Sequence, residues 1–292
     1  MNTVINFKRL VIYVVLIIMT IGCGSNSGSP SATRLDSLTY ADANLAACVA
    51  SESAGKTYVY ELTILSCSGK GISDLTGIEK LVSLRTLYLN MNNITDIDPL
   101  STLLDLSTLY IYNNTINDVS PLSGLTNLTT LMAYQNSISD VSDLSSLTEL
   151  TVLYLGDNNL SDISPLSGLT KLYYLDIANN VVSNIAPITT LVDITTLSAS
   201  GNSIVDVSPI ATMTKMNDLY LYNNNIGDQG VGKVDTLNTL TVATRIALNN
   251  NIGMSCAELA SLITDLGSPP VDTDSNYSNS DAATNGVNCT NP

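Results

Sequence analysis

The sequence predicts a repeat solenoid, a fold in which similar units stack in a row and offer one long concave surface to partners. The first observation is a leucine that recurs every 22 residues, eight times from Leu65 to Leu219. A fixed period of this length is typical of solenoids. The second is the alternating segment Leu87-Tyr88-Leu89, which predicts a short strand with leucines inward and the residue between them outward. The third is that about seven apolar residues per unit cannot offset the entropy lost on ordering a unit, so the units must stack.

The chain begins with a predicted signal peptide at residues 1–22. Lys8 and Arg9 precede an apolar run at residues 10–21, which is shorter than the roughly 20 residues that a membrane-spanning helix needs. A positive flank, a short apolar core and small residues at its end are typical of secretory signals. The stretch Thr20-Ile21-Gly22-Cys23 also resembles a bacterial lipobox, which implies lipidation of Cys23. The alternatives are a plain signal peptide and an uncleaved anchor.

Residues 23–39 are predicted to be a flexible tether, because residues 24–33 are rich in Gly, Ser and Pro. Gly24 stands where an Asp would favour retention at the inner membrane of a Gram-negative cell, so the expected location is the outer membrane or cell surface. Loss of the leader moves the formal charge from −15 to about −17. Such a surface repels phosphate groups, so nucleic-acid binding is excluded, and membrane attachment is expected through the N-terminal lipid only.

A helical N-terminal cap is predicted for residues 40–58. Asp42 is positioned to cap a short helix whose Leu45, Cys48 and Val49 share one face. Such a helix would cover the first strand of the stack, and a covered edge does not invite aggregation.

Four cysteines beyond Cys23 predict two disulfides in an exported chain. Strands in a sheet lie about 4.8 Å apart, so the two ends of a nine-strand stack are on the order of 40 Å apart. A disulfide tolerates at most about 7 Å between Cα atoms. The predicted pairs are therefore Cys48–Cys67 and Cys256–Cys289, unless the cysteines are free. The chain has no histidine and neither pair has the spacing of a metal site, so no metal and no cofactor are predicted.

The repeats are predicted to occupy residues 59–252, with about nine strands. An asparagine recurs where the chain leaves each strand, and a buried amide there can satisfy the backbone groups of the turn. An aspartate column follows, which we interpret as local bonding to backbone amides in preference to a calcium ladder. The asparagine column is Asn92, Asn114, Asn136, Asn158, Asn180, Asn202, Asn224 and Asn251, and the aspartate column is Asp74, Asp96, Asp118, Asp140, Asp162, Asp206 and Asp228, with Asn184 in the same column.

These columns resemble the bacterial leucine-rich repeats of the internalin-like, 22-residue class over about residues 40–290. The resemblance implies an α/β horseshoe with a parallel sheet on the concave face and turns with short 3₁₀ segments on the convex face. It also implies recognition of a protein through the concave face. A proline column agrees with 3₁₀ segments and is broken by Asp143; it comprises Pro99, Pro121, Pro165, Pro187 and Pro209.

The end of the repeat region departs from the period. From Leu219 to the equivalent Ile246 the step is 27 residues, and the insert resembles the longer repeats of ribonuclease-inhibitor type, which implies a true helix on the convex side. A helical C-terminal cap is predicted at residues 253–292. Ser255 and Glu258 form a capping box there, and Gly267 stops the helix.

The outward strand positions are the candidate binding residues. Nine of the 14 tyrosines lie among them, although the chain has one Phe and no Trp. Tyrosine suits any outward strand position, but it also gives rigid amphipathic contact area at low entropy cost. The small residues Ala178, Ser198 and Ser200 are expected to leave a dip beside them. The candidates are Tyr88, Tyr110, Tyr112, Met132, Tyr134, Tyr154, Tyr173, Tyr174, Asp176, Asp218, Tyr220 and Tyr222.

Catalysis is not expected. Without histidine the ordinary base for a Ser or Cys nucleophile is missing. Asp176 and Asp218 are expected about 10 Å apart by register, within the range of inverting glycosidases, but solvent exposure should prevent a raised pKa.

The sequence therefore predicts a lipid-anchored, protein-binding module at the bacterial envelope, for example an adhesin. One alternative is a glycan-binding surface lipoprotein, because tyrosine rings also stack on sugars. Another is an architectural envelope protein without a tight ligand. The sequence assigns no oligomeric state.

Overall fold

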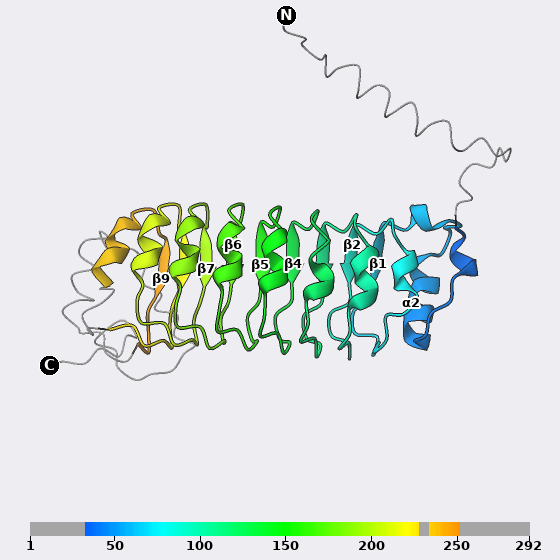
Figure 1. The fold of residues 1–292 in the computed structure, drawn as a ribbon, viewed down its shortest axis with the longest axis horizontal. Coiled ribbons are helices and arrows are strands. Elements are labelled where there is room, and N and C mark those ends of the chain that lie inside the picture. The colour runs from blue at the N-terminus through cyan, green and yellow to red at the C-terminus, as the bar shows by residue number, and fades with distance from the viewer. Residues whose placement is uncertain (1–32, 228–233, 252–292) are drawn as a thin grey trace, which may run out of the picture. The chain divides into compact units, whose positions relative to one another are not determined.

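The computed structural model describes residues 33–227 and 234–251, and these contain one nine-stranded parallel sheet. The strands follow one another in chain order, so each repeat pairs only with its neighbours (Figure 1). The strands are β1 (Ile64–Ser66), β2 (Thr86–Tyr88), β3 (Thr108–Tyr110), β4 (Thr130–Met132), β5 (Val152–Tyr154), β6 (Tyr174–Asp176), β7 (Thr196–Ser198), β8 (Asp218–Tyr220) and β9 (Arg245–Ala247). None of the helices in the described ranges is long and apolar enough to cross a membrane.

The register of the sheet follows the leucine column. Leu65 pairs with Leu87 at the first strand pair, and the same alignment continues to Leu219. Leu219 then pairs with Ile246, which confirms the 27-residue step. A slip of one residue would turn every one of these leucines to the opposite face, so the inward column fixes the register.

The core is one continuous row of apolar side chains between the sheet and the opposite side of the solenoid. In a single repeat the inward residues are at most 1% exposed. Each of them contributes about 1.5 to 3 kcal/mol on burial, and adjacent repeats share these contacts. For the second repeat these residues are Leu81, Leu84, Leu87, Leu89, Ile94, Ile97 and Leu100.

Short 3₁₀ helices form the side opposite the sheet, as predicted. Those in the proline-containing repeats have the proline in their first turn, where its missing N–H costs nothing. These helices are η3 (Ile78–Lys80), η4 (Asp98–Thr102), η5 (Ser120–Leu122), η6 (Ser142–Ser146), η7 (Ser164–Gly168), η8 (Ala186–Thr190), η9 (Ser208–Thr212) and η10 (Val234–Thr239).

The prediction of a true helix in the long repeat is wrong for the described part of that repeat. Its convex segment, η10, is a six-residue 3₁₀ helix. The buried residues Val234, Leu237 and Leu240 recur every three residues, which is the period of a 3₁₀ helix and not of an α-helix. Residues 228–233 of the insert lie outside the described ranges.

The asparagine column forms a hydrogen-bonded ladder across the repeats, beyond the C-terminal ends of the strands, as predicted. The side chain of Asn114 accepts a hydrogen bond from the Ile94 N–H at 3.0 Å. Its amide donates to the carbonyl oxygens of Leu89 and Ile111. Each asparagine therefore satisfies backbone groups of its own turn and of the preceding repeat.

The aspartate column bonds to local backbone, also as predicted. Asp118 Oδ1 accepts a hydrogen bond from the Ser120 N–H at 2.8 Å, and Asp140 does the same with Ser142. These hydrogen bonds lower the pKa of both carboxyl groups. In the described ranges, no three His, Cys, Asp or Glu side chains come together as a metal-binding group. Asp228 lies outside those ranges.

Helix α2 (Ala43–Glu52) covers the β1 end of the sheet, as predicted for the N-terminal cap. Asp42 caps it, with Oδ1 accepting from the Asn44 and Leu45 N–H groups. Leu45, Cys48 and Val49 are buried. The predicted Cys48–Cys67 disulfide is present, with 5.8 Å between the Cα atoms. The Cys256–Cys289 pair and the C-terminal cap lie outside the described residues.

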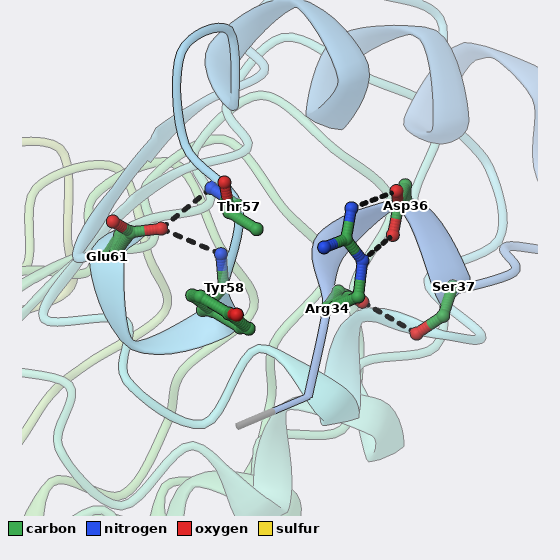
Figure 2. A network of polar contacts seen from close by, with 6 residues as sticks. All are labelled: Arg34, Asp36, Ser37, Thr57, Tyr58 and Glu61. Carbon is green, nitrogen blue, oxygen red and sulfur yellow. Dashed lines mark hydrogen bonds and ion pairs between the residues drawn. The ribbon is translucent and has the colours of Figure 1, made fainter. Parts of the chain in front are cut away.

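The cap extends further toward the N-terminus than the sequence predicts, because residues 34–39 are folded and are not part of a tether. Leu35, in η1 (Leu35–Ser37), is 7% exposed. Arg34 forms an antiparallel bridge with Tyr58, next to η2 (Val59–Glu61). Figure 2 shows the polar contacts at this bridge, in which the Arg34 guanidinium donates to the Asp36 carboxylate and Glu61 accepts from two backbone N–H groups. Two leucines, Leu35 and Leu38, in a short polar stretch are too few to show a period, so the sequence pattern does not reveal this segment. Cys23 and residues 1–32 lie outside the described ranges.

Candidate binding surface on the concave face

The candidate residues occupy three rows along the sheet. The first row contains the first position of each strand, which Tyr174 and Asp218 occupy in β6 and β8. The second row contains the third strand position, and the third row lies two residues beyond each strand. All of these side chains are partly exposed. The second row contains Tyr88, Tyr110, Met132, Tyr154, Asp176 and Tyr220, and the third contains Tyr112, Tyr134 and Tyr222.

Tyr173 lies outside these rows. It precedes β6, and 48% of its surface is exposed. Its neighbour Tyr174 occupies the first position of β6 on the concave face. A pair of adjacent tyrosines in the sequence therefore contributes one residue to the concave rows.

Six tyrosines form one continuous set of ring contacts, which we call the tyrosine array. It consists of Tyr88, Tyr110, Tyr112, Tyr134, Tyr154 and Tyr174. The ring centroids of successive members are 4.8, 6.4, 4.3, 6.2 and 4.4 Å apart. The shortest two distances belong to stacked pairs, Tyr112 with Tyr134 and Tyr154 with Tyr174. The array therefore crosses five strands, from β2 to β6, as one aromatic surface.

The array runs diagonally because its spacing changes along the chain. Tyr112 and Tyr134 are 22 residues apart and share a row, whereas the steps from Tyr134 to Tyr154 and from Tyr154 to Tyr174 are 20 residues. A step two residues shorter than the repeat places the next tyrosine on the next strand but one row closer to the start of the strand. The array thus passes from the third row at Tyr134 to the second at Tyr154 and the first at Tyr174. This spacing is the sequence signal that could have identified the array.

Packing of the rings changes the pKa values of their hydroxyl groups. Burial, followed by the interaction with Tyr112, raises the pKa of Tyr134 to about 12. Burial and the hydroxyl of Tyr154 raise the pKa of Tyr174 further, and burial raises that of Tyr110. These phenols therefore stay neutral hydrogen-bonding groups over the physiological range.

We expect the alkaline titration of the array to be late. Tyr134 has a folded pKa near 12 against an ordinary value of 10, so its contribution to stability is complete below pH 10 and is lost between pH 10 and 12. Absorbance at the phenolate band should show tyrosines that ionise well after those of the same chain in urea. Tyr134→Phe should remove part of the late phase. Coincident titration curves for the folded and unfolded chains would contradict the packing described.

Asp176 differs from its expected state, because it is partly buried and not solvent-exposed. Burial raises the pKa of its carboxyl group, and hydrogen bonds from Ala178 and Ser198 oppose that rise only in part. The Ala178 N–H donates to Asp176 Oδ1 at 2.9 Å. A Cβ atom at Gly156 would lie 3.1 Å from Asp176 Oδ2, so the carboxylate lies directly against that glycine. The register gives the cause, since Tyr154 is the cross-strand neighbour of Asp176.

Beyond Asp176 the rows contain small residues and then a second aromatic group. Ser198 pairs with Asp176 on one side and with Tyr220 on the other. Arg245 Nη1 donates to the Tyr220 hydroxyl at 2.8 Å, and its guanidinium carbon lies 5.9 Å from the ring centroid. The small residues expected to form a dip therefore separate the tyrosine array from the Tyr220 group along the sheet.

Known proteins share this architecture. A family model described as leucine-rich repeats in two copies matches residues 61–102, 105–146 and 148–190. Internalin C2 from Listeria monocytogenes is 32% identical over 77% of this chain and 100% of that chain, with a TM-score of 0.68. Another internalin from the same organism, inlF, is 30% identical over 82% of this chain and 84% of that chain, with a TM-score of 0.62.

The functional domain of Listeria InlJ, described as including a cysteine ladder, is 26% identical over 80% of this chain and 56% of that chain, with a TM-score of 0.64. No curated protein matches the chain. The repeat model, the two internalins at 30% identity or more and the nine-strand parallel sheet agree with one another. The chain belongs to the leucine-rich repeat family, and within it to the internalin-like proteins.

Proposed function

We propose that this chain is a protein-binding module, attached to the bacterial envelope by a lipid on Cys23, that contacts its partner through the concave face. The tyrosine array is the observation that carries the proposal. Tyrosine is enriched at protein interfaces because its ring gives a large apolar contact and its hydroxyl gives a polar one. A row of rings already packed against each other loses little further side-chain entropy on binding.

The chemistry of the described surface favours binding over catalysis. The chain has no histidine, and the described concave rows are mostly tyrosine, threonine and small residues, with two aspartates and Arg245. The formal charge of −15 disfavours nucleic acid as the partner. We therefore propose a non-enzymatic role.

Export to the outer membrane or cell surface is the location we propose. The Cys48–Cys67 disulfide supports it, because such bonds form and persist in oxidising compartments. The predicted leader with Cys23 supports the lipid anchor. Metabolic labelling with a palmitate analogue should mark the wild-type chain and leave Cys23→Ala unlabelled.

The binding face is tested by substituting Tyr110, Tyr112 and Tyr154 with Ala in one chain. We expect this triple variant to lose at least about tenfold in affinity for a protein that cross-links to the wild-type mature domain, since central aromatic residues often carry 2 kcal/mol or more. The control is Tyr60→Ala with Tyr173→Ala, which removes two exposed tyrosines outside the array. Cross-linking from intact cells with mass spectrometry measures the effect.

Two outcomes would contradict the proposal. Equal capture by the triple variant would show that the array does not contact the partner. A specific saccharide bound on a glycan array, lost in the triple variant and unaccompanied by a protein cross-link, would assign the face to glycan recognition instead.

A further inference from the structure

We propose that Asp176, together with Tyr134, Tyr154 and Tyr174, forms a subsite for a lysine or arginine side chain of the protein partner. This inference rests on the proposed function, because it assigns the partner chemistry recognised at one point of the concave face. It concerns the β6 end of the tyrosine array, where Asp176 is the cross-strand neighbour of Tyr154.

The geometry places the carboxylate among the three rings. Tyr154 and Asp176 are direct cross-strand neighbours in β5 and β6. Tyr174 lies two residues before Asp176 on the same face of β6, and its ring stacks on Tyr154 at 4.4 Å. The Tyr134 ring lies 6.2 Å from that of Tyr154. The charge of Asp176 also contributes to the raised pKa values of Tyr134 and Tyr174, so both hydroxyl groups are within its electrostatic reach.

Among the described residues, no cation compensates the Asp176 carboxylate. Its partners are the Ala178 N–H and the Ser198 hydroxyl, and the charge that acts on it is that of Asp157, which has the same sign. The ion pairs Arg34–Asp36, Lys80–Glu79, Lys171–Glu149 and Lys215–Asp193 all lie elsewhere. Taking a charge partly out of water without a counter-ion is costly. A cationic group on a partner would remove that cost, whereas a neutral or acidic group would not.

Tyrosine faces next to a carboxylate are suited to such a group. A cation within about 6 Å of a ring centroid is attracted by the π-electrons, and a carboxylate adds a charge-assisted hydrogen bond. Because Gly156 has no side chain, the Asp176 carboxylate can occupy this position. A Cβ atom at residue 156 would lie 3.1 Å to 3.3 Å from three atoms of the carboxylate group. The cluster therefore combines charge complementarity with aromatic walls, and it fits the strongly acidic balance of the chain.

The test uses three short capped peptides, Gly-Lys-Gly, Gly-Arg-Gly and Gly-norleucine-Gly, titrated into the full mature chain. NMR spectra of ¹³C-labelled tyrosine rings measure binding at each ring. We expect the lysine and arginine peptides to shift the signals of Tyr134, Tyr154 and Tyr174, with dissociation constants on the order of millimolar. The norleucine peptide, which has the same length of apolar chain without the charge, should leave these signals in place.

Asp176→Asn is the decisive variant, because it removes the charge and keeps an acceptor for the Ala178 N–H. We expect the lysine peptide to bind at least about tenfold more weakly, because one hydrogen bond to a charged group is lost. Gly156→Ala should weaken binding as well, by displacing the carboxylate. Asp105→Asn is the matched control, since it removes an exposed carboxylate outside the concave rows and should leave the affinity unchanged.

The inference is overturned if the norleucine peptide binds as well as the lysine peptide, if neither basic peptide shifts the rings, or if folded Asp176→Asn binds undiminished. Each of these results leaves the cross-linking experiment on Tyr110, Tyr112 and Tyr154 untouched. Conversely, intact partner capture by that triple variant would refute the proposed function even if the lysine peptide binds at Asp176.

Discussion

Asn158→Ala is expected to lower the free energy of unfolding by about 3 to 5 kcal/mol, because it leaves several buried backbone groups without partners at about 1 to 3 kcal/mol each. Asn158 is buried, and its Oδ1 accepts from the Ile138 N–H at 2.9 Å. Its Nδ2 donates to the carbonyl oxygens of Ala133, Leu155 and Gly156. The alanine side chain can replace none of these hydrogen bonds. Urea unfolding followed by circular dichroism and tyrosine fluorescence measures the loss.

The neighbouring Asn159→Ala is the matched control. Asn159 is exposed in the same turn, and surface substitutions of this kind usually change stability by less than about 0.5 kcal/mol. If the two variants lose equal stability, the effect belongs to the turn conformation and the asparagine ladder is not its cause. A change in the denaturant slope with Asn158→Ala would show that the repeats unfold separately, as a chain of nearest-neighbour units can.

The repeat period was enough to predict the sheet residue by residue. Leu65, Leu87 and the later leucines stand in direct register, because the inward row can accept only apolar residues and a parallel stack has no freedom to shift one repeat against the next. The asparagine and aspartate columns were equally predictable, since each side chain bonds to backbone within three residues or in the adjacent repeat. The same side-chain hydrogen bonds to nearby backbone groups recur at a fixed spacing, so one repeat predicts the others.

The concave surface was predictable only as a set of positions. The sequence placed Tyr154, Tyr174 and Asp176 on the same face, but ring contacts depend on the rotamers that neighbouring side chains allow. The partial burial of Asp176 follows from the ring of Tyr154 beside it and from the glycine at position 156. These are relations between repeats, and a pattern defined within one repeat does not contain them. The folded segment around Leu35 escaped prediction for a similar reason, because its partners lie near Tyr58.

Removal of the Cys48–Cys67 bond, by Cys48→Ala together with Cys67→Ala, is expected to lower the free energy of unfolding by about 2 to 4 kcal/mol. The bond closes a loop with a sequence separation of 19, and for a loop of this length the lost chain entropy alone is worth roughly 3 kcal/mol. The bond also joins α2 to the residue that follows β1. Since a repeat stack holds each unit through its neighbours, loss of the bond should loosen the β1 end first.

Amide hydrogen exchange distinguishes this local effect from a general one. In the double variant the amides of β1 and β2 should exchange faster. The amides of β6 and β7 should keep their wild-type exchange rates, except for those that exchange only through global unfolding. Cys256→Ala with Cys289→Ala is the matched control, because it tests the other predicted pair at the opposite end of the chain. If the Cys48 and Cys67 variant accelerates exchange equally in β1 and β7, the disulfide acts on the unfolded chain alone, and α2 is not a cap that holds the first repeat in place.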